Sequence, residues 1–201
     1  MFRIVCLLIG YGIGCIETAY FVGKLWKTDL RRYGSGNLGT TNALRVLGKK
    51  AGALTFVGDI LKSLVAFFLC RAVFPEAPLA GVYGGVGAIL GHDFPFYLHF
   101  RGGKGIAATI GLTLSIVLTM EPRLAIPTTV LGVCAVILTR MISVGSLVLS
   151  LTIPVSCYVL SLPLELVVLT ALLCVLAFWR HKENIRRILA GNENTFSLKK
   201  K

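Results

Sequence analysis

Three segments of the sequence combine glycine with hydroxyl, amide and basic side chains, which are groups that proteins use to bind phosphate. The first, residues 34–45, reads Gly-Ser-Gly-Asn-Leu-Gly-Thr-Thr-Asn-Ala-Leu-Arg. Glycines let backbone N–H groups converge on an anion, hydroxyl groups add donors, and the Arg45 guanidinium offers a planar bidentate partner for phosphate. An Asn/Gly turn with a helix cap at Thr40 or Thr41 explains the same residues equally well. The segment therefore predicts a phosphate loop or a capped turn, leading in both cases into a short interfacial helix.

The second segment, residues 91–105, begins with Gly-His-Asp-Phe-Pro and ends with Gly-Gly-Lys-Gly. A glycine run that opens a helix presents free N–H groups at the positive end of the helix dipole, and Lys104 adds an ammonium beside them. The spacing is not that of a Walker A loop, and the alternative for Lys104 is a snorkelling lysine at a helix end. His92 and Asp93 are candidate catalytic groups, although Asp93 before Phe-Pro is more typical of a turn. The segment favours a phosphate site at the start of the next helix.

The third segment, residues 180–193, reads Arg-His-Lys-Glu-Asn-Ile-Arg-Arg-Ile-Leu-Ala-Gly-Asn-Glu. His181 and Asn184 stand three apart, so they share one face of a helix and are expected to look inward. A basic juxtamembrane helix on anionic lipid head groups is the alternative for the segment as a whole. Ser143, in the turn 140–146, is a further candidate donor.

The elements that position these segments are predicted to be membrane helices. Of the 201 residues, 55% are hydrophobic and 15% are charged, against about 25% charged in an ordinary soluble domain. A transmembrane helix needs roughly 20 mostly apolar residues, with about 17 as a lower limit. The stretches that qualify are Arg3 to Gly23, Ala51 to Ala72, Pro78 to Phe100, Lys104 to Met120, Arg123 to Thr139, Val144 to Leu160 and Pro163 to Trp179. We therefore predict an all-α, polytopic membrane protein with seven transmembrane helices in a single domain, residues 1–201.

Basic residues predict how these spans are oriented. Only Arg3, Arg71 and Arg123 fall on one side, whereas the other side holds most of the Lys and Arg residues, including the closing lysines 199–201. By the positive-inside rule the amino terminus is outside and the carboxyl terminus is cytoplasmic. The polar segments then all lie on the cytoplasmic side, at about residues 24–50, 91–105, 140–146 and 180–193. A net charge of +12 in so apolar a chain indicates a membrane surface or an anionic substrate, not nucleic acid.

Three ionisable residues fall well inside the predicted spans, namely Glu17, Asp59 and Lys62. Asp59 and Lys62 are three apart on one helix face and can pair. An intramembrane relay and a local pair that stabilises the helices are both open, and the second is favoured. The third span carries small residues at spacings that let helix backbones approach closely, which indicates packing: Gly81, Gly84, Gly85, Gly87 and Gly91.

Motifs that the sequence lacks narrow the chemistry. It contains no H-E-x-x-H, no G-x-S-x-G elbow, no paired carboxylates for two metals, and no H-x4-D pattern of the common glycerolipid acyltransferases. Metal catalysis is therefore not expected, and no metal or cofactor is predicted. What remains is a set of anion-binding groups with one histidine at the cytoplasmic membrane face, which predicts small phosphorylated substrates, at least one of them lipidic.

Together the three segments resemble the bacterial acyl-phosphate:glycerol-3-phosphate acyltransferase family, PlsY, over nearly the whole chain. The resemblance implies an enzyme of the bacterial cytoplasmic (inner) membrane that moves an acyl chain from acyl phosphate to the 1-hydroxyl of sn-glycerol 3-phosphate. The products are lysophosphatidic acid and phosphate. The partners are these substrates and membrane lipids, and the enzyme is expected to act as a monomer. The alternative is a transporter or flippase for a small phosphorylated anion, although the polar groups gather at one edge instead of the midplane.

Within this resemblance, site residues are assigned by substrate. The acyl-phosphate head is assigned to Ser35, Gly36, Asn37, Thr41, Gly102, Gly103 and Lys104. Glycerol 3-phosphate is assigned to Arg45, Lys104, Ser143, His181 and Asn184. The catalytic group is expected to comprise Ser35, Lys104, His181 and Asn184.

The expected mechanism is direct attack by the glycerol hydroxyl on the acyl carbonyl, because no activated nucleophile is evident. The proton acceptor is either His181 or a phosphate oxygen of the donor. The donor phosphate is favoured, with His181 orienting the acceptor, because the only nearby carboxylate in sequence, Glu183, is on a different helix face.

Overall fold

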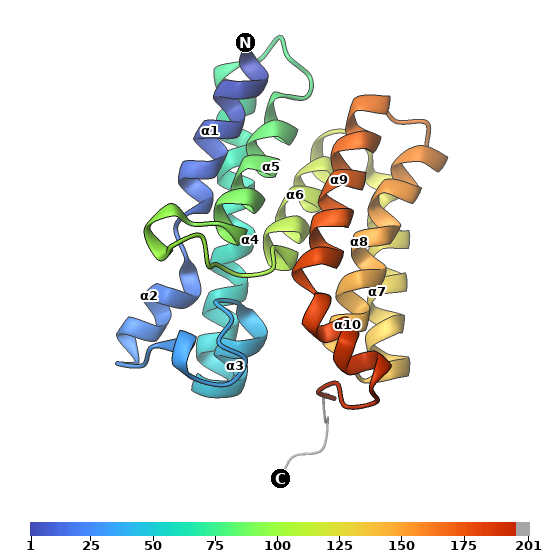
Figure 1. The fold of residues 1–201 in the computed structure, drawn as a ribbon. Coiled ribbons are helices and arrows are strands. Elements are labelled where there is room, and N and C mark those ends of the chain that lie inside the picture. The colour runs from blue at the N-terminus through green and yellow to red at the C-terminus, as the bar shows by residue number, and fades with distance from the viewer. Residues whose placement is uncertain (196–201) are drawn as a thin grey trace. The chain divides into compact units, whose positions relative to one another are not determined.

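The computed structural model describes residues 1–195, and every regular element in that range is a helix (Figure 1). The predicted all-α fold class is confirmed. Lysines 199–201, which the sequence assigns to the basic side, lie outside the described residues. The α-helices are α1 (Phe2–Gly14), α2 (Thr18–Leu25), α3 (Thr40–Leu47), α4 (Lys49–Val73), α5 (Ala80–Asp93), α6 (Ile106–Thr119), α7 (Ala125–Thr139), α8 (Ile142–Val159), α9 (Leu164–Arg180) and α10 (Lys182–Leu189). Short 3-10 helices lie in the connections: η1 (Leu30–Arg32), η2 (Phe96–Leu98) and η3 (Pro122–Leu124).

Within residues 1–195, four helical segments are long and apolar enough to cross a membrane. They are Phe2–Leu25, which joins α1 and α2, Lys49–Val73, Pro122–Thr139 and Ile142–Val159. A fifth is obtained when α9 and α10, which are bent by 60°, are counted as one broken span. The membrane character expected from composition is confirmed, whereas the count of seven spans stays a prediction.

Two of the predicted spans are shorter than expected. Helix α5 ends at Asp93 instead of Phe100, because Pro95 cannot donate a helix hydrogen bond and disfavours helical backbone in the residue before it. Helix α6 begins at Ile106 instead of Lys104, because Gly105 has φ of +73°, outside the right-handed helical region. At 14 residues each, both helices are about 21 Å long, less than the roughly 30 Å of a hydrocarbon core.

The chain divides into two compact units, an N-terminal one of Met1–Ile116 and a C-terminal one that begins at Val117. The prediction of a single domain over residues 1–201 stays a prediction. In the C-terminal unit, α8 packs against both α7 and α9. Helix α10 then turns away from α9 at His181.

In the N-terminal unit, glycines bring α5 against α1 and α4. A Cβ atom on Gly84 would overlap the Ala66 carbonyl of α4, and one on Gly87 would overlap the Leu7 carbonyl of α1. The helix backbones are therefore in direct contact, as small residues at membrane helix interfaces permit. The packing role predicted for these glycines is confirmed.

A small apolar core ties the first polar segment to the second. It consists of Ala19, Leu30, Leu38, Ala43 and Leu98. These residues come from α2, η1, the following loop, α3 and η2. Because η2 lies in the second polar segment and η1 to α3 span the first, this core fixes the two loops beside each other.

Candidate active site

Asn42 holds the backbone of the first polar segment. Its side chain is buried in α3, where Oδ1 accepts a hydrogen bond from the Ser35 N–H at 2.9 Å. Its Nδ2 donates to the carbonyls of Leu30 at 3.1 Å and Tyr33 at 3.2 Å. One buried amide therefore organises the turn, while the Ser35 residue itself is exposed. The sequence pattern places Asn42 in this segment but does not indicate its role.

Other residues of this segment are accessible. Gly36 forms a turn with φ of +69°, and its N–H donates to the Tyr33 carbonyl at 3.0 Å. Thr41 and Arg45 are exposed and four residues apart on α3, so they share a face. Asn37 is half-buried. These groups can contact a ligand that approaches from outside the N-terminal unit.

The alternative prediction of a helix cap at Thr40 or Thr41 is wrong. Helix α3 begins at Thr40, its N-cap is Gly39, and no side chain caps it. The Thr40 hydroxyl is buried and has no hydrogen-bond partner among residues 1–195. The segment is therefore not explained by side-chain capping.

The amides of the second segment are used differently from the expectation. The Gly102 N–H donates to the Asp93 carbonyl at 3.2 Å, and the Gly103 N–H donates to the His92 carbonyl at 3.0 Å. The sequence predicts that these two N–H groups are free to bind an anion, and this prediction is wrong. They fold the loop back onto the end of α5 instead.

Lys104 nevertheless stands at the positive end of a helix. It is half-buried, and Gly105, whose carbonyl accepts from the Thr109 N–H at 2.7 Å, follows it and starts the first turn of α6. The first amides of a helix lack partners within it and carry partial positive charge. The ammonium and the start of α6 together favour an anion at this place.

Both glycines before Lys104 are required by close packing. A Cβ atom on Gly102 would overlap the His92 carbonyl. One on Gly103 would overlap His92 Nε2 and lie 2.7 Å from the Leu38 carbonyl. The contact with Leu38 joins the first and second polar segments directly.

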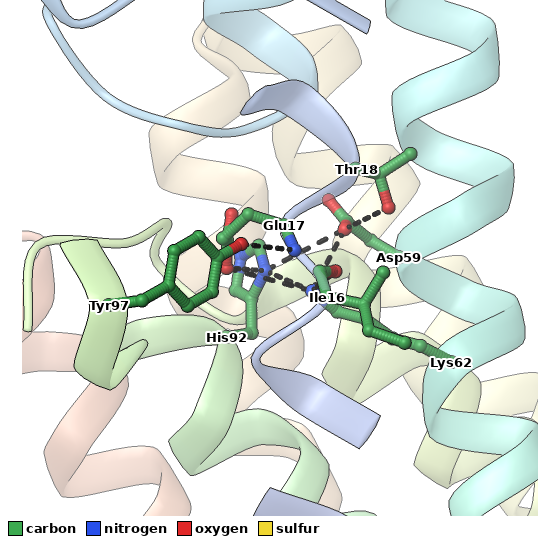
Figure 2. A network of polar contacts seen from close by, with 7 residues as sticks. All are labelled: Ile16, Glu17, Thr18, Asp59, Lys62, His92 and Tyr97. Atoms are coloured by element: carbon green, nitrogen blue, oxygen red, sulfur yellow. Dashed lines mark hydrogen bonds and ion pairs between the residues drawn. The ribbon is translucent and has the colours of Figure 1, made fainter. Parts of the chain in front are cut away.

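Four buried ionisable side chains, Glu17, Asp59, Lys62 and His92, form a cluster in the N-terminal unit (Figure 2). Lys62 Nζ is 3.1 Å from Asp59 Oδ1, so the predicted pair is confirmed, and 3.7 Å from Glu17 Oε1. His92 Nδ1 lies 2.7 Å from Lys62 Nζ and 3.1 Å from Glu17 Oε1. Sequence reasoning did not connect Glu17 and His92 to the pair, since no local pattern links residues so far apart.

In the C-terminal unit, His181 lies at the junction of α9 and α10 and is buried, as expected. Its Nδ1 is 2.7 Å from the Ala177 carbonyl oxygen. A carbonyl only accepts, so Nδ1 carries the proton, and Nε2 of the neutral ring is an acceptor. The arrangement suits a histidine that receives a hydrogen bond from a substrate hydroxyl.

Glu193 brings the other two candidate residues of this unit together. Its carboxylate accepts hydrogen bonds from Ser143 Oγ at 2.9 Å, Asn184 Nδ2 at 2.7 Å and Arg187 Nε at 2.7 Å. Burial disfavours its charge, but these hydrogen bonds hold the pKa of the Glu193 carboxyl below its ordinary value. Sequence reasoning missed this residue; its only signal was an acid in a basic segment.

Each unit thus holds part of the predicted site. The N-terminal unit carries Ser35, Gly36, Asn37, Thr41, Arg45, Gly102, Gly103 and Lys104, and the C-terminal unit carries Ser143, His181 and Asn184. Within residues 1–195, no group of three or more His, Cys, Asp or Glu side chains is arranged to hold a metal ion. The roles of these residues stay predictions.

The fold and these segments define a helical integral membrane protein whose polar loops suit phosphorylated ligands. Residues 4–191 match the model of the glycerol-3-phosphate acyltransferase family. The chain belongs to this family, which confirms the resemblance drawn from its motifs.

Known relatives and solved structures are similar to this chain along almost its entire length. The glycerol-3-phosphate acyltransferase of Thermoanaerobacter pseudethanolicus is 36% identical over 200 residues, which cover 99% of this chain and 98% of the relative. That of Alkaliphilus metalliredigens is 38% identical with the same coverage. A crystal structure of PlsY, an integral membrane glycerol 3-phosphate acyltransferase, in its glycerol 3-phosphate form has a TM-score of 0.88 at 29% identity, covering 97% of this chain and 96% of that one. Its lysophosphatidic acid form has a TM-score of 0.85 at 28% identity, covering 97% and 95%.

Proposed function

We propose that this protein transfers an acyl chain from acyl phosphate to the 1-hydroxyl of sn-glycerol 3-phosphate, releasing lysophosphatidic acid and phosphate. The observation that carries the proposal is the likeness to PlsY over 97% of the chain, in structures described as glycerol 3-phosphate and lysophosphatidic acid forms. These two molecules are the acceptor and the product of the proposed reaction. Family membership and the cationic, donor-rich loops support it further.

The acyl-phosphate head would contact the N-terminal unit. Ser35, Thr41 and the loop around them offer hydroxyl and backbone donors, and Lys104 at the start of α6 supplies positive charge. Since the Gly102 and Gly103 amides already have partners, these glycines would contribute by packing closely against His92, which sets the path of the loop that carries Lys104. The residues assigned to this head are Ser35, Gly36, Asn37, Thr41, Gly102, Gly103 and Lys104.

Glycerol 3-phosphate would be bound by Arg45, Lys104, Ser143, His181 and Asn184. The Asn184 amide carries two hydrogens, so it can serve Glu193 and a substrate oxygen together, and a hydroxyl such as Ser143 can accept while it donates. His181 Nε2 would accept from a glycerol hydroxyl and orient it. The ammonium of Lys104 would neutralise both phosphates and the oxyanion of the tetrahedral intermediate.

The acceptor hydroxyl would attack the acyl carbonyl directly, without an acyl-enzyme. The C–O bond to the glycerol oxygen forms, the bond to the phosphate oxygen breaks, and the hydroxyl proton passes to the departing phosphate. The donor is a mixed anhydride with a good leaving group, so alignment and charge neutralisation carry most of the rate; alignment alone is worth about 7–11 kcal/mol in favourable systems. His181 would orient the acceptor instead of removing its proton.

The enzyme would act as a monomer in the bacterial cytoplasmic membrane, as a single domain with seven spans, the amino terminus outside and the carboxyl terminus cytoplasmic. The asymmetry of basic residues supports this orientation. Single cysteines can test it, because Ser35, Glu76 and Asn192 are all exposed. We expect Ser35→Cys and Asn192→Cys to react only from the cytoplasm and Glu76→Cys from outside. The exposed native Cys134 is first replaced by serine, and labelling of Ser35→Cys from outside would contradict the topology.

The reaction is tested with purified protein, palmitoyl phosphate and glycerol 3-phosphate, by following phosphate release and lysophosphatidic acid together. Acyl-CoA and acyl carrier protein thioesters serve as alternative donors, and we expect neither to support turnover. Equal rates with acyl-CoA would reject the donor assignment. If the folded protein shows no turnover with acyl phosphate and glycerol 3-phosphate, the proposed function is rejected.

A further inference from the structure

The imidazole of His92 faces two different parts of the N-terminal unit. On one side, Nδ1 lies 2.7 Å from Lys62 Nζ and 3.1 Å from Glu17 Oε1. On the other side, Nε2 lies so close to the Cα of Gly103 that no Cβ atom would fit between them. The ring therefore stands between the buried ionisable cluster, which Figure 2 shows, and the loop that carries Lys104.

The cluster is fixed by several elements of the fold. Asp59 of α4 accepts a hydrogen bond from the Thr18 hydroxyl at 2.9 Å, and Lys62 Nζ donates to the Ile16 carbonyl at 3.2 Å. Ile16 and Glu17 lie in the break between α1 and α2, where helix hydrogen bonding is interrupted. The Glu17 N–H also donates to the Tyr97 hydroxyl of η2 at 3.4 Å. Helix α4, the break between α1 and α2, and η2 are thus tied to one another beside His92.

Burial makes the charged forms of these side chains energetically unfavourable. Glu17 is 0% exposed, Asp59 1%, Lys62 6% and His92 2%. The desolvation of buried ions often outweighs their attraction, so apolar residues of similar volume would stabilise the helices at least as well. Ionisable groups kept inside a membrane span point to a role other than stability.

The orientation of the ring follows from its neighbours. Nδ1 lies between the Lys62 ammonium and the Glu17 carboxylate, and Nε2 faces Gly103. The His92 main chain contacts the loop too, since its carbonyl accepts from the Gly103 N–H at 3.0 Å. A shift of residue 92 therefore shifts Gly103, and with it Lys104.

We propose that His92 is a positioning residue for Lys104, with the cluster of Glu17, Asp59 and Lys62 holding the imidazole and the imidazole holding Gly103. This inference rests on the proposed function, because the rate of acyl transfer is the quantity that reports the position of Lys104. His92 touches neither substrate in this role. It keeps the ammonium where both phosphates and the developing oxyanion are reached.

The test is a double-mutant cycle between His92 and Lys104, with kcat/KM for palmitoyl phosphate measured at saturating glycerol 3-phosphate. A misplacement of about 1 Å costs about 10²-fold in rate, so His92→Ala should lose about that factor. In the Lys104→Ala background the same change should cost less than about threefold, because the residue that it positions is already absent. His92→Gln, whose amide can still reach Gly103, should recover part of the loss.

Controls separate this role from general damage to the fold. Ser63→Ala alters the neighbour of Lys62, a buried residue whose hydroxyl has no hydrogen-bond partner among the described residues, and should leave kcat/KM and the unfolding midpoint unchanged. If His92→Ala does not fold, His92→Gln and Glu17→Gln take its place in the cycle. Equal losses with and without Lys104, near-normal activity of folded His92 variants, or a glutamine variant no better than alanine would overturn the inference. Absence of turnover by the unmodified protein would instead reject the proposed function.

Discussion

The carboxylate of Glu193 accepts a hydrogen bond from Asn184 Nδ2 at 2.7 Å. The same oxygen accepts from Ser143 at 2.9 Å, so a residue beyond α10 joins α10 to α8 within the C-terminal unit. Two side chains proposed to bind glycerol 3-phosphate are therefore held by an anionic group of the protein itself. The single hydrogen of the Ser143 hydroxyl is used for Glu193, so towards a substrate this hydroxyl can only accept a hydrogen bond.

Removing the Glu193 carboxylate should destabilise the protein. Glu193→Ala leaves three donors without their acceptor, and a buried group that loses its partner costs about 1–3 kcal/mol. Thermal unfolding of the detergent-solubilised protein measures the change. Glu183→Ala is the matched control, because this exposed acid of α10 pairs with an exposed arginine and such pairs contribute about 0–1 kcal/mol. Equal midpoints for both variants would contradict the role of Glu193.

Stability should fall in acid through the same carboxylate. Burial disfavours the charge of Glu193, but hydrogen bonds from Asn184, Arg187 and Ser143 keep its pKa below the ordinary value. Its stabilisation is therefore complete above the unfolded-state pKa of about 4.3 and is lost as the pH falls through the folded-state pKa. Below about pH 5 the unfolding midpoint should drop more steeply for the unmodified protein than for Glu193→Gln, which does not titrate. Parallel curves would exclude Glu193 as the source.

The charge of Lys104 should matter for chemistry as well as for binding. Loss of a donor from an oxyanion site costs about 10²–10³ in turnover, and Lys104→Ala should lose at least that factor at saturating substrates. Lys104→Arg keeps the charge but not the shape and should stay impaired. Arg101→Ala is the control, since it removes an exposed cation from the same loop. Near-normal turnover of folded Lys104→Ala would leave this residue as a snorkelling lysine.

His181→Ala distinguishes the two candidate proton acceptors. If the donor phosphate takes the proton, the variant should chiefly raise KM for glycerol 3-phosphate, and saturating acceptor should restore much of kcat. The Nδ1 bond to the Ala177 carbonyl agrees with an orienting histidine. Steady-state kinetics over a range of acceptor concentrations makes the measurement. A kcat that remains low at saturation would assign the base to His181.

Asn42 should hold the backbone of the first polar loop in position through its buried side chain. Asn42→Ala removes the acceptor for the Ser35 N–H and the donor for two carbonyls, which should cost about 1–3 kcal/mol. Activity should fall about 10²-fold if Ser35 moves by about 1 Å. Asn42→Asp keeps the acceptor but sets a carboxylate against the Leu30 and Tyr33 carbonyls, so it should not rescue. Full activity in either variant, measured beside the exposed Asn194→Ala, would contradict this role.

Local patterns predicted what depends on near neighbours in the chain. Apolar length indicated the long helices, and spacing of three predicted the Asp59–Lys62 pair, now seen at 3.1 Å. The predicted end of α5 was wrong because apolar residues continue past Pro95. The apolar stretch is therefore longer than the helix, which the proline ends. That proline was the available signal.

Contacts between distant segments had no such signal. Glu17 reaches His92 only because the first span breaks at residues 15–17 and α5 packs beside it. The partners of the Gly102 and Gly103 amides were hidden for a related reason, since a glycine run reveals freedom of the backbone but not which carbonyl it will meet. Glu193 acquires its partners only when α8 and α10 are both in place.

The burial of α5 has a consequence for how the protein is made. Every residue of this helix except Leu90 is buried, so α5 has almost no surface to offer to lipid. Its glycines fit against the backbones of α1 and α4, and these two helices also pack on each other. Both precede α5 in the chain, and domains generally assemble from the amino terminus during synthesis. When α5 leaves the ribosome, the two helices that receive it already exist.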